Sequence, residues 1–289
     1  MQMEETLNTA WEEPSNDISN DERPMSIRKI SKASIVMNAT LLFLAIVSIY
    51  AFFTFDYKNV NLIEAFSSTF YNLKIVFLEP HLKHFSVHET IWQLIVTLGL
   101  TVLTTLIGSV IALFFGLFAA QNLSTKLASN IIKAVVAFIR AVPTVLWVLI
   151  FAVAAGLGSV AAVIGITFHT IGYLIKAFSE SFEELDKGVI EALKGSGANW
   201  WQIVFQAVIP SCASYLISWT FLRFEINFTY AILMGAAAGA GGIGFDLYMA
   251  GGHYFDLREV GFITYIILAV ALVLEVISTR MKVKLSGFD

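Results

Sequence analysis

Long apolar runs separated by shorter polar segments fill the chain from residue 35 onward. A helix needs about 20 apolar residues to cross the hydrocarbon core of a bilayer. Six stretches meet this requirement, at residues 35–55, 91–119, 130–155, 157–178, 211–235 and 260–280. The pattern therefore predicts an all-α integral membrane protein with about six transmembrane helices. Arg223 and Glu225 interrupt the fifth stretch and Glu275 interrupts the sixth, so these two are the least uniform.

The polar segments divide the chain into four parts. Residues 1–33 are polar and acidic, and we expect them to form a solvated cytoplasmic tail with no cleavable signal peptide. Residues 34–90 hold the first transmembrane helix and an outer amphipathic segment. A membrane core follows at 91–281, with a charged cytoplasmic connection at 179–209, and residues 282–289 form a second cytoplasmic tail.

The distribution of Lys and Arg predicts the orientation of the spans, because cytoplasmic loops carry an excess of these residues. With the N-terminus inside, the cytoplasmic segments hold 12 cations: Arg23, Arg28, Lys29, Lys32, Lys126, Lys133, Lys176, Lys187, Lys194, Arg280, Lys282 and Lys284. The outer segments hold only 4, namely Lys58, Lys74, Lys83 and Arg258. Both termini are therefore predicted to be cytoplasmic.

Composition agrees with a bilayer as the main solvent. The chain is 57% hydrophobic and only 14% charged, with a mean hydropathy of +0.75. Soluble domains have about 45–50% apolar and about 25% charged residues, so a soluble globular domain is excluded. Cys212 is the single cysteine, which excludes an internal disulfide framework, and its apolar neighbours predict a buried small residue.

The connection at 179–209 predicts two short helices with a tight turn between them. A helix carrying Glu191 and Ala192 is expected to break at Gly195 and Gly197, because glycine tolerates the backbone of a turn. A second, amphipathic helix follows, with one apolar face formed by Trp200, Ile203, Val204 and Ala207. Pro210 suits the first turn of the next span. Such a pair fits a groove of another protein, although an ordinary solvated loop is the alternative.

The sequence E-A-x-x-x-x-G-A, followed by an amphipathic helix that ends in I-P, resembles the coupling motif of ABC importer permeases. The matching residues are Glu191, Ala192, Gly197, Ala198 and Pro210. The resemblance implies the type I importer permease architecture, with this segment docked on a cytoplasmic ABC ATPase dimer. It also implies that ATP and Mg are bound by that partner, that this chain has no cofactor and no catalytic residues, and that it lies in the bacterial cytoplasmic membrane.

Three further stretches, over roughly residues 90–280, are similar to the phosphonate importer permease. They are Arg140-Ala-Val-Pro143, Arg223-Phe-Glu225-Ile-Asn227 and the glycine-rich run from Gly235 to Gly244. The resemblance implies a phosphorus oxyanion as substrate, an extracytoplasmic phosphonate-binding protein and a second permease copy, identical or paralogous. Thr229 departs from the family pattern, which has a second arginine there, and this lowers the positive charge along the pathway.

Charged residues inside the spans point to the same pathway. A charge in the bilayer is costly, so Arg140 and Arg223 are expected to face the bundle interior or a water-filled cavity. Arg223 and Asn227 share a helix face and are predicted to line the path. Glu225 points away from that face and is predicted to pair with Arg140. A guanidinium bonds phosphonate oxygens in bidentate fashion. The alternative is a purely structural role for both arginines.

The glycine-rich run satisfies the dinucleotide-binding fingerprint only in its letters. It comprises Gly235, Gly239, Gly241, Gly242 and Gly244. The run follows an apolar span and lies in no βαβ unit, so nucleotide binding is rejected. Small residues allow close approach between helices in lipid, and we expect packing or an outer gate here.

Histidines give weaker candidates. His81, His84 and His88 are spaced to share one helical face and form a possible zinc site, although no carboxylate or cysteine completes the ligand set. An interfacial polar face is the favoured interpretation, and no metal is predicted. His169 is expected to be a hydrogen-bonded core residue or a pathway residue, and His253 a possible contact for a binding protein.

Other classes of membrane protein fit less well. An intramembrane serine protease would have to use Ser196, which lies in the charged loop with no histidine at matching depth. Secondary transporters usually show internal repeats and broken helices, which this pattern does not predict. Among importers, the alternative is a permease for an amino acid or a quaternary amine, but a cation would be repelled by Arg140 and Arg223.

Overall fold

The computed structural model describes residues 32–54 and 61–286, which form helices and contain no β-strand. The elements are α1 (Lys32–Thr54), α2 (Leu62–Leu78), α3 (Val87–Ala119), α4 (Lys126–Ala141), α5 (Thr144–Ala155), α6 (Ser159–Glu183), α7 (Lys187–Gly195), α8 (Trp200–Ile203), the π-helix η1 (Val204–Val208), α9 (Ile209–Ala238), α10 (Ile243–Tyr248), the π-helix η2 (Met249–His253) and α11 (Leu257–Ser286). The predicted all-α architecture is confirmed. Residues 1–31 of the predicted acidic tail and residues 287–289 of the predicted C-terminal tail lie outside the described residues, while residues 282–286 continue α11.

Five helices of the described chain are long and apolar enough to cross a membrane, and a bent pair of helices makes a possible sixth span. The chain divides into two compact units, Met1–Asn61 and Leu62–Asp289. In the first unit, α1 has 23 residues and none of them is buried. A helix that is apolar all round fits a lipid-facing span.

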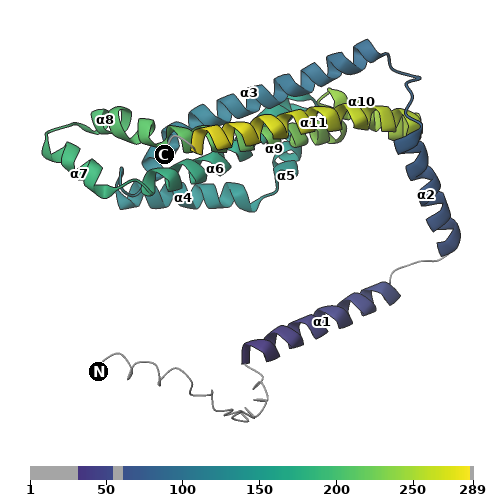
Figure 1. The fold of residues 1–289 in the computed structure, drawn as a ribbon, viewed down its shortest axis with the longest axis horizontal. Helices are drawn as coiled ribbons and strands as arrows, with labels where there is room; N and C mark the ends of the chain where they lie inside the picture. The colour runs from purple at the N-terminus through teal and green to yellow at the C-terminus, as the bar shows by residue number, and fades with distance from the viewer. Residues whose placement is uncertain (1–31, 55–60, 287–289) are drawn as a thin grey trace, which may run out of the picture. The chain divides into compact units, whose positions relative to one another are not determined.

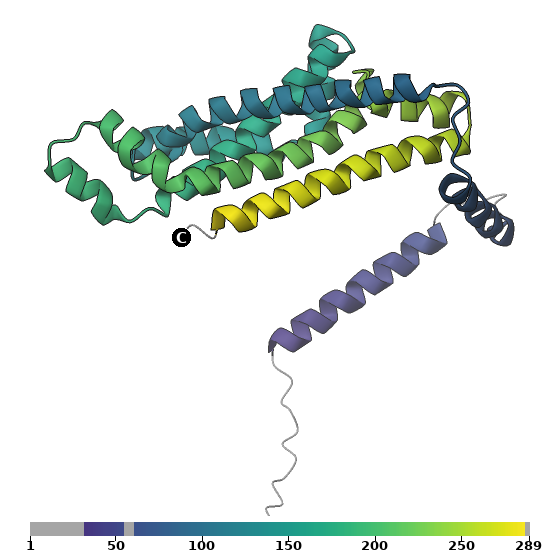
Figure 2. The ribbon, with the colours of Figure 1, turned by 45° about the horizontal axis from the view of Figure 1, so that its top comes forward.

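The second unit is a helical bundle in which α3, α6 and α9 pack on one another, and α3 runs along one edge of the bundle in Figures 1 and 2. Small residues allow these helices to pack closely, as expected in lipid. A Cβ added to Gly108 of α3 would lie 2.5 Å from the Thr170 side chain of α6, and one added to Gly116 would lie 3.2 Å from Phe178. On the flanks, α4 and α5 pack on α6, while α11 packs on α9 and on α2. The helix α2, which lies in the predicted outer amphipathic segment, thus packs on the last helix of the chain.

The third predicted span, at 130–155, is wrong as a single straight helix. The helices α4 and α5 meet at a bend of 89°. Pro143 lies at this bend. Proline cannot donate a backbone hydrogen bond, and it disfavours helical geometry in the residue before it, so Val142 takes an extended conformation (ψ 125°). Trp147 Nε1 donates to Ile139 O across the bend at 2.9 Å, which satisfies one of the carbonyls left free by the break.

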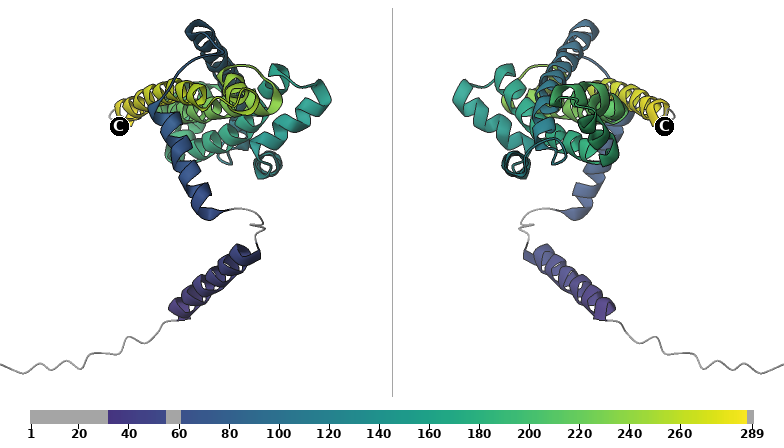
Figure 3. Two further views of the ribbon diagram at one scale, coloured as in Figure 1. Left: turned by 90° about the vertical axis from the view of Figure 1, so that its right-hand side faces the viewer. Right: turned by 90° about the vertical axis from the view of Figure 1, so that its left-hand side faces the viewer.

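Two features mark the opposite ends of the bundle. The short helices α7 and α8 project at one end, and α10 lies at the other (Figure 1). The views along the bundle in Figure 3 show how the helices of this unit group around its centre. From Trp200 to Ala238 the chain forms a continuous helix of 39 residues, because η1 joins α8 to α9. Pro210 lies in the first turn of α9 as predicted, but no loop separates α9 from the helix before it.

Candidate functional site

The predicted helix pair between the fourth and fifth spans consists of α7 and α8, and we call residues 187–203 the α7–α8 hairpin. Asp186 caps α7 by accepting from Gly188 N at 2.9 Å. The helix ends at Gly195, and Gly197 has φ +84°, a conformation that favours glycine. A capping box formed by Asn199 and Gln202 then starts α8. Local sequence signals therefore determine both ends of the turn.

The exposed face of the hairpin carries most of the residues singled out by the sequence motif. Glu191, Ala192, Gly195 and Gly197 are exposed, and Ala198 is half-buried. Ile190, Ile203 and Val204 point inward and are almost fully buried. The hairpin thus presents a small, charged, glycine-containing tip to its surroundings while its apolar side is packed against the bundle.

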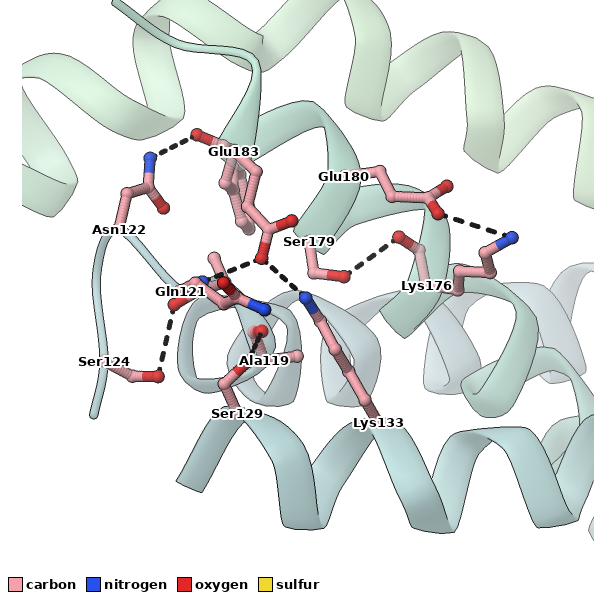
Figure 4. A network of polar contacts seen from close by, with 12 residues as sticks. Ala119, Gln121, Asn122, Ser124, Ser129, Lys133, Lys176, Ser179, Glu180 and Glu183 are labelled. Carbon is pink, nitrogen blue, oxygen red and sulfur yellow. Dashed lines mark hydrogen bonds and ion pairs between the residues drawn. The ribbon is translucent and has the colours of Figure 1, made fainter. Parts of the chain in front are cut away.

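The α8 end of the hairpin and the end of α6 are each attached to the corner between α3 and α4. Trp200 Nε1 donates to Leu123 O at 2.8 Å, and the Trp200 ring stacks on Phe118 with centroids 5.5 Å apart. In the last turn of α6, Phe182 O accepts from Asn122 Nδ2 at 2.7 Å (Figure 4). The hairpin and the end of α6 therefore share contacts with the same corner.

Glu183, the last residue of α6, joins the same corner to α4. Its Oε1 accepts from Gln121 N at 2.8 Å and from Lys133 Nζ at 2.7 Å (Figure 4). Ser129 Oγ also donates to Ala119 O at 2.5 Å. The ends of α3, α4 and α6 thus form one hydrogen-bonded network beside the hairpin.

Deep in the bundle, Arg223 is buried, with 2% of its surface exposed. Its Nε donates to Thr170 Oγ1 at 3.1 Å, and its Nη2 lies 3.0 Å from His169 Nδ1. Because a guanidinium only donates, His169 must accept at Nδ1 and carry its proton on Nε2. The guanidinium also lies over the rings of Tyr173 and Tyr230, at 5.2 and 5.8 Å from their centroids.

Asn227 extends this polar cluster toward α3. Its Nδ2 donates to Thr105 Oγ1 at 2.9 Å, and its Oδ1 lies 3.1 Å from Thr170 Oγ1. Both Arg223 and Asn227 are thus buried and hydrogen-bonded in this conformation, and their predicted role in lining the path stays a prediction. Thr105 and Thr170 were not singled out from the sequence. The available signal in the sequence was the spacing of the threonines along α3, which places them on roughly one helix face. The buried ones are Thr90, Thr97, Thr101, Thr104 and Thr105.

Arg140 lies elsewhere, in a groove between α4 and α6 next to Tyr173, Lys176, Glu180 and Trp219. Within the described chain, no carboxylate lies within ion-pair distance of Arg140. The predicted pair between Arg140 and Glu225 is therefore wrong. Because α4 ends at the bend, Arg140 stays on the α4–α6 surface, whereas Glu225 is half-buried on α9.

The glycine run lies at the end of the bundle that bears α10. Gly239, Gly241 and Gly242 have φ of +63°, +77° and +76°, so they turn the chain from α9 into α10. A Cβ on Gly235 would come within 2.6 Å of Gly241 O, and one on Gly244 would overlap the carbonyl of Ile232. These glycines allow backbone to pack on backbone.

Hydrogen bonds to α3 hold the start of α10. Gln93 Oε1 accepts from Gly242 N at 3.1 Å, and Thr97 Oγ1 accepts from Ile243 N at 2.9 Å. On α10 itself, Asp246 is buried, and its Oδ2 has no hydrogen-bond partner in the described part of the chain. Burial raises the pKa of Asp246 to about 6, and the neighbouring carboxylates of Glu89 and Glu259 add to this shift.

The three outer histidines do not share a helical face, so that prediction is wrong. His81 and His84 lie in the non-helical link between α2 and α3, and His88 lies in α3. His84 Nδ1 instead lies 2.8 Å from Glu259 Oε2, and its ring stacks on Tyr254. His84, Asp256 and Glu259 are close enough to hold a metal ion, but Glu259 Oε1 already accepts from three backbone N–H groups, those of residues 83, 84 and 85.

Comparison with known proteins places this geometry in a family. Residues 112–285, more than half of the chain, match the binding-protein-dependent transport system inner membrane component family. The phosphate-import permease protein PhnE of Mycolicibacterium smegmatis is 32% identical over 153 residues, which cover 53% of this chain and 29% of that protein. The phosphite transport system permease protein PtxC of Stutzerimonas stutzeri is 31% identical over 190 residues, covering 65% of this chain and 68% of that protein.

A solved structure shares the fold. The inward-facing MetNI methionine ABC transporter contains a chain that matches with a TM-score of 0.60 and 22% sequence identity, covering 70% of this chain and 99% of that one. The chain spans less than a third of the length of the Mycolicibacterium relative and about two thirds of the Stutzerimonas one. By the family match and the second of these relatives, the chain belongs to the family of inner membrane components of binding-protein-dependent transport systems.

Proposed function

We propose that this chain is the permease subunit of an ATP-driven importer that moves phosphonate or a related phosphorus oxyanion across the bacterial cytoplasmic membrane. It contributes no catalytic residues. A separate ABC ATPase dimer binds ATP and Mg and hydrolyses the nucleotide. An extracytoplasmic binding protein delivers the anion, and two permease copies form the path between them.

The α7–α8 hairpin is the observation that carries this proposal. Its exposed part holds Glu191, Ala192 and Gly197, and its α8 end is attached to the α3–α4 corner through Trp200, while Asn122 attaches the preceding end of α6 to the same corner. A partner that pushes on this tip therefore moves the ends of α3, α4 and α6 together. Closure of the ATPase dimer opens the path outward, and hydrolysis returns the inward-facing state.

The substrate class rests on charge and on the relatives. Arg140 and Arg223 are both cationic side chains within the membrane core, and neither has a carboxylate partner among the described residues. Such positions favour an anion and repel a quaternary amine. The two relatives reported above are named as permeases for phosphate and phosphite. A small zwitterionic amino acid is the alternative substrate, since the fold is shared with a methionine transporter.

A double variant tests the coupling role. Glu191→Lys reverses an exposed charge, and Gly197→Asp places a side chain in a backbone conformation that disfavours it. We expect that the ATPase no longer copurifies with the double variant in detergent and that uptake falls to background. Lys74→Glu is the matched control, because it reverses an exposed charge on α2, far along the chain from the hairpin. Normal copurification and uptake in the double variant would refute the assignment.

The substrate is tested with the full complex in proteoliposomes. Methylphosphonate, phosphite, phosphate, methionine and glycine betaine are offered one at a time, with the binding protein inside or outside as the orientation requires. We expect ATP-dependent uptake of at least one oxyanion and none of methionine or betaine. Uptake of methionine alone would support the alternative and exclude the oxyanion.

A further inference from the structure

The groove between α4 and α6 contains more charged residues than the sequence motif singled out. A cavity of about 240 Å³ lies between the two helices, and Lys133, Arg140, Lys176, Glu180 and Glu183 are its charged lining residues. A smaller cavity of about 90 Å³ continues from it, shares Arg140, Lys176 and Glu180, and adds Tyr173 and Trp219. Ionic side chains on membrane helices face a protein interior or water, and we therefore take this groove to face the aqueous path.

The charges in the groove do not balance. Lys133 Nζ pairs with Glu183 Oε1 at 2.7 Å, and Lys176 Nζ pairs with Glu180 Oε1 at 3.3 Å. Arg140 is the third cation, and no described carboxylate lies within 4.0 Å of it. The groove thus carries one guanidinium without a counter-ion, at the point where the two cavities meet.

The two ion pairs differ in how firmly they are held. Glu183 also accepts from the backbone N–H of Gln121, which fixes its carboxylate and therefore Lys133. The Lys176–Glu180 pair joins neighbouring turns of one helix, and its side chains are 46% and 55% exposed. Exposed pairs of this kind contribute little free energy, so Lys176 can leave Glu180 at small cost.

We infer that Arg140 and Lys176 form a transient binding site for a phosphorus oxyanion on its way to the cytoplasm, and that Glu180 controls its release by competing for Lys176. This inference rests on the proposed function. A phosphoryl group carries roughly −1.5 to −2 charges at neutral pH, enough to draw both cations. Tyr173 and Trp219 line the same cavity and bring hydroxyl and indole donors.

The competition by Glu180 solves a problem that two fixed cations would create. An anion held by Arg140 and Lys176 together would leave slowly, because each charge-assisted bond must break without a replacement. When Glu180 recaptures Lys176, the anion is left with Arg140 alone. The carboxylate therefore substitutes for the substrate at the lysine, and the site empties toward the cytoplasm.

Glu180→Gln gives the sharpest test, because it separates binding from transport. With methylphosphonate as the probe, we expect the purified complex to retain about fivefold more anion than the wild type, since one exposed ion pair no longer competes. Uptake in proteoliposomes should fall at the same time. Arg140→Gln should lower both retention and uptake by about tenfold, and Arg140→Lys should restore part of each.

Lys126→Gln is the matched control, because it removes one cation from α4 outside the groove. Thermal melting of each complex separates a folding defect from a binding defect. If retention in Arg140→Gln equals that in Lys126→Gln, or if Glu180→Gln lowers retention, the inference is overturned while the proposed function stands. If the wild-type complex takes up no oxyanion, the proposed function itself fails.

Discussion

Arg223 shows how a membrane protein can bury a charge among neutral partners. A cation at the centre of a bilayer costs about 2.5–3.5 kcal/mol on insertion scales. A hydrogen bond to a charged group contributes about 1.5–3 kcal/mol, and a ring face adds about 0.5–2 kcal/mol. With Thr170, His169 and two tyrosines around it, the guanidinium is held without a carboxylate from the part of the chain that the structure describes. Its orientation is therefore fixed by geometry, and its charge is left uncompensated.

The sequence was informative about this residue but not about its surroundings. An arginine inside an apolar run is visible at once, and so is its shared face with Asn227. The partners of Arg223 were not predictable, because the sequence does not distinguish Thr105 and Thr170 from other threonines that pack between helices. Their contacts are defined only by the arrangement of the helices in space. Glu225 was chosen as a partner for Arg140 because opposite charges in lipid are expected to pair, and the bend before Pro143 prevents this.

Asp246 is the residue for which we expect a measurable dependence of stability on pH. Its pKa is raised from the ordinary 3.8 to about 6 by burial and by Glu89 and Glu259, so the folded state binds its proton more tightly than the unfolded state does. Stability should therefore fall as the pH rises from about 4 to about 6, by about 3 kcal/mol when complete.

Asp246→Asn should remove this dependence. We expect its melting temperature in detergent to exceed that of the wild type at pH 7.5 and to equal it near pH 4. Asp256→Asn is a comparison variant at a nearby, half-buried aspartate, whose Oδ1 accepts the backbone N–H bonds of Arg258 and Glu259. An equal gain for Asp246→Asn at both pH values would show that burial of the charge is not the cause.

At the scale of the elements, helix ends were more predictable than helix paths. The Gly195–Gly197 turn and the position of Pro210 followed from local backbone preferences. Length and hydrophobicity identify a span but carry no information on its direction, so they did not predict the bend between α4 and α5. Pro143 was the residue that indicated the position of the bend. The π-helix η1 has no such signal in the sequence, since it depends on the packing of Val204, Ala207 and Val208 against the bundle.

The close packing of α9 against α10 gives a prediction for a matched pair of glycines. Gly244→Ala would bring a Cβ onto the carbonyl of Ile232, and a backbone atom cannot move aside. We expect a loss of about 3 kcal/mol or more in the free energy of unfolding. Gly99→Ala adds the same methyl group to open space on α3 and should stabilise by up to about 1 kcal/mol. Thermal melts of the two variants in one detergent compare them, and equal melting temperatures would contradict the packing.

At the scale of the whole molecule, composition and the spacing of apolar runs were sufficient to predict an all-α membrane protein. They were not sufficient to place the helices around α3, α6 and α9, because pairing in lipid depends on small residues such as Gly108 and Gly116, whose partners lie far away in the sequence. The family resemblance supplied what periodicity could not, namely the hypothesis that the charged connection docks on a partner.

The predicted orientation can be tested with single cysteines. Cys212 is 2% exposed, so a Cys212→Ala background removes the one native thiol with little change at the surface. Ser196→Cys, at the exposed tip of the hairpin, should react with a membrane-impermeant maleimide only after the cells are opened. Lys83→Cys, in the link before α3, should react in intact cells. The reverse labelling pattern would invert the topology.

The unbroken helix from Trp200 to Ala238 has a mechanical consequence. Its 39 residues make a rod about 58 Å long, with the α7–α8 hairpin at the Trp200 end and the glycine turn at its far end. Arg223 anchors this rod to its neighbours partway along, which leaves arms of about 35 Å and about 23 Å. A rod that pivots at Arg223 acts as a lever whose pivot lies between its two ends. Its ends swing in opposite directions, and the larger displacement at the hairpin end becomes a smaller, stronger one at the end that bears the glycine turn.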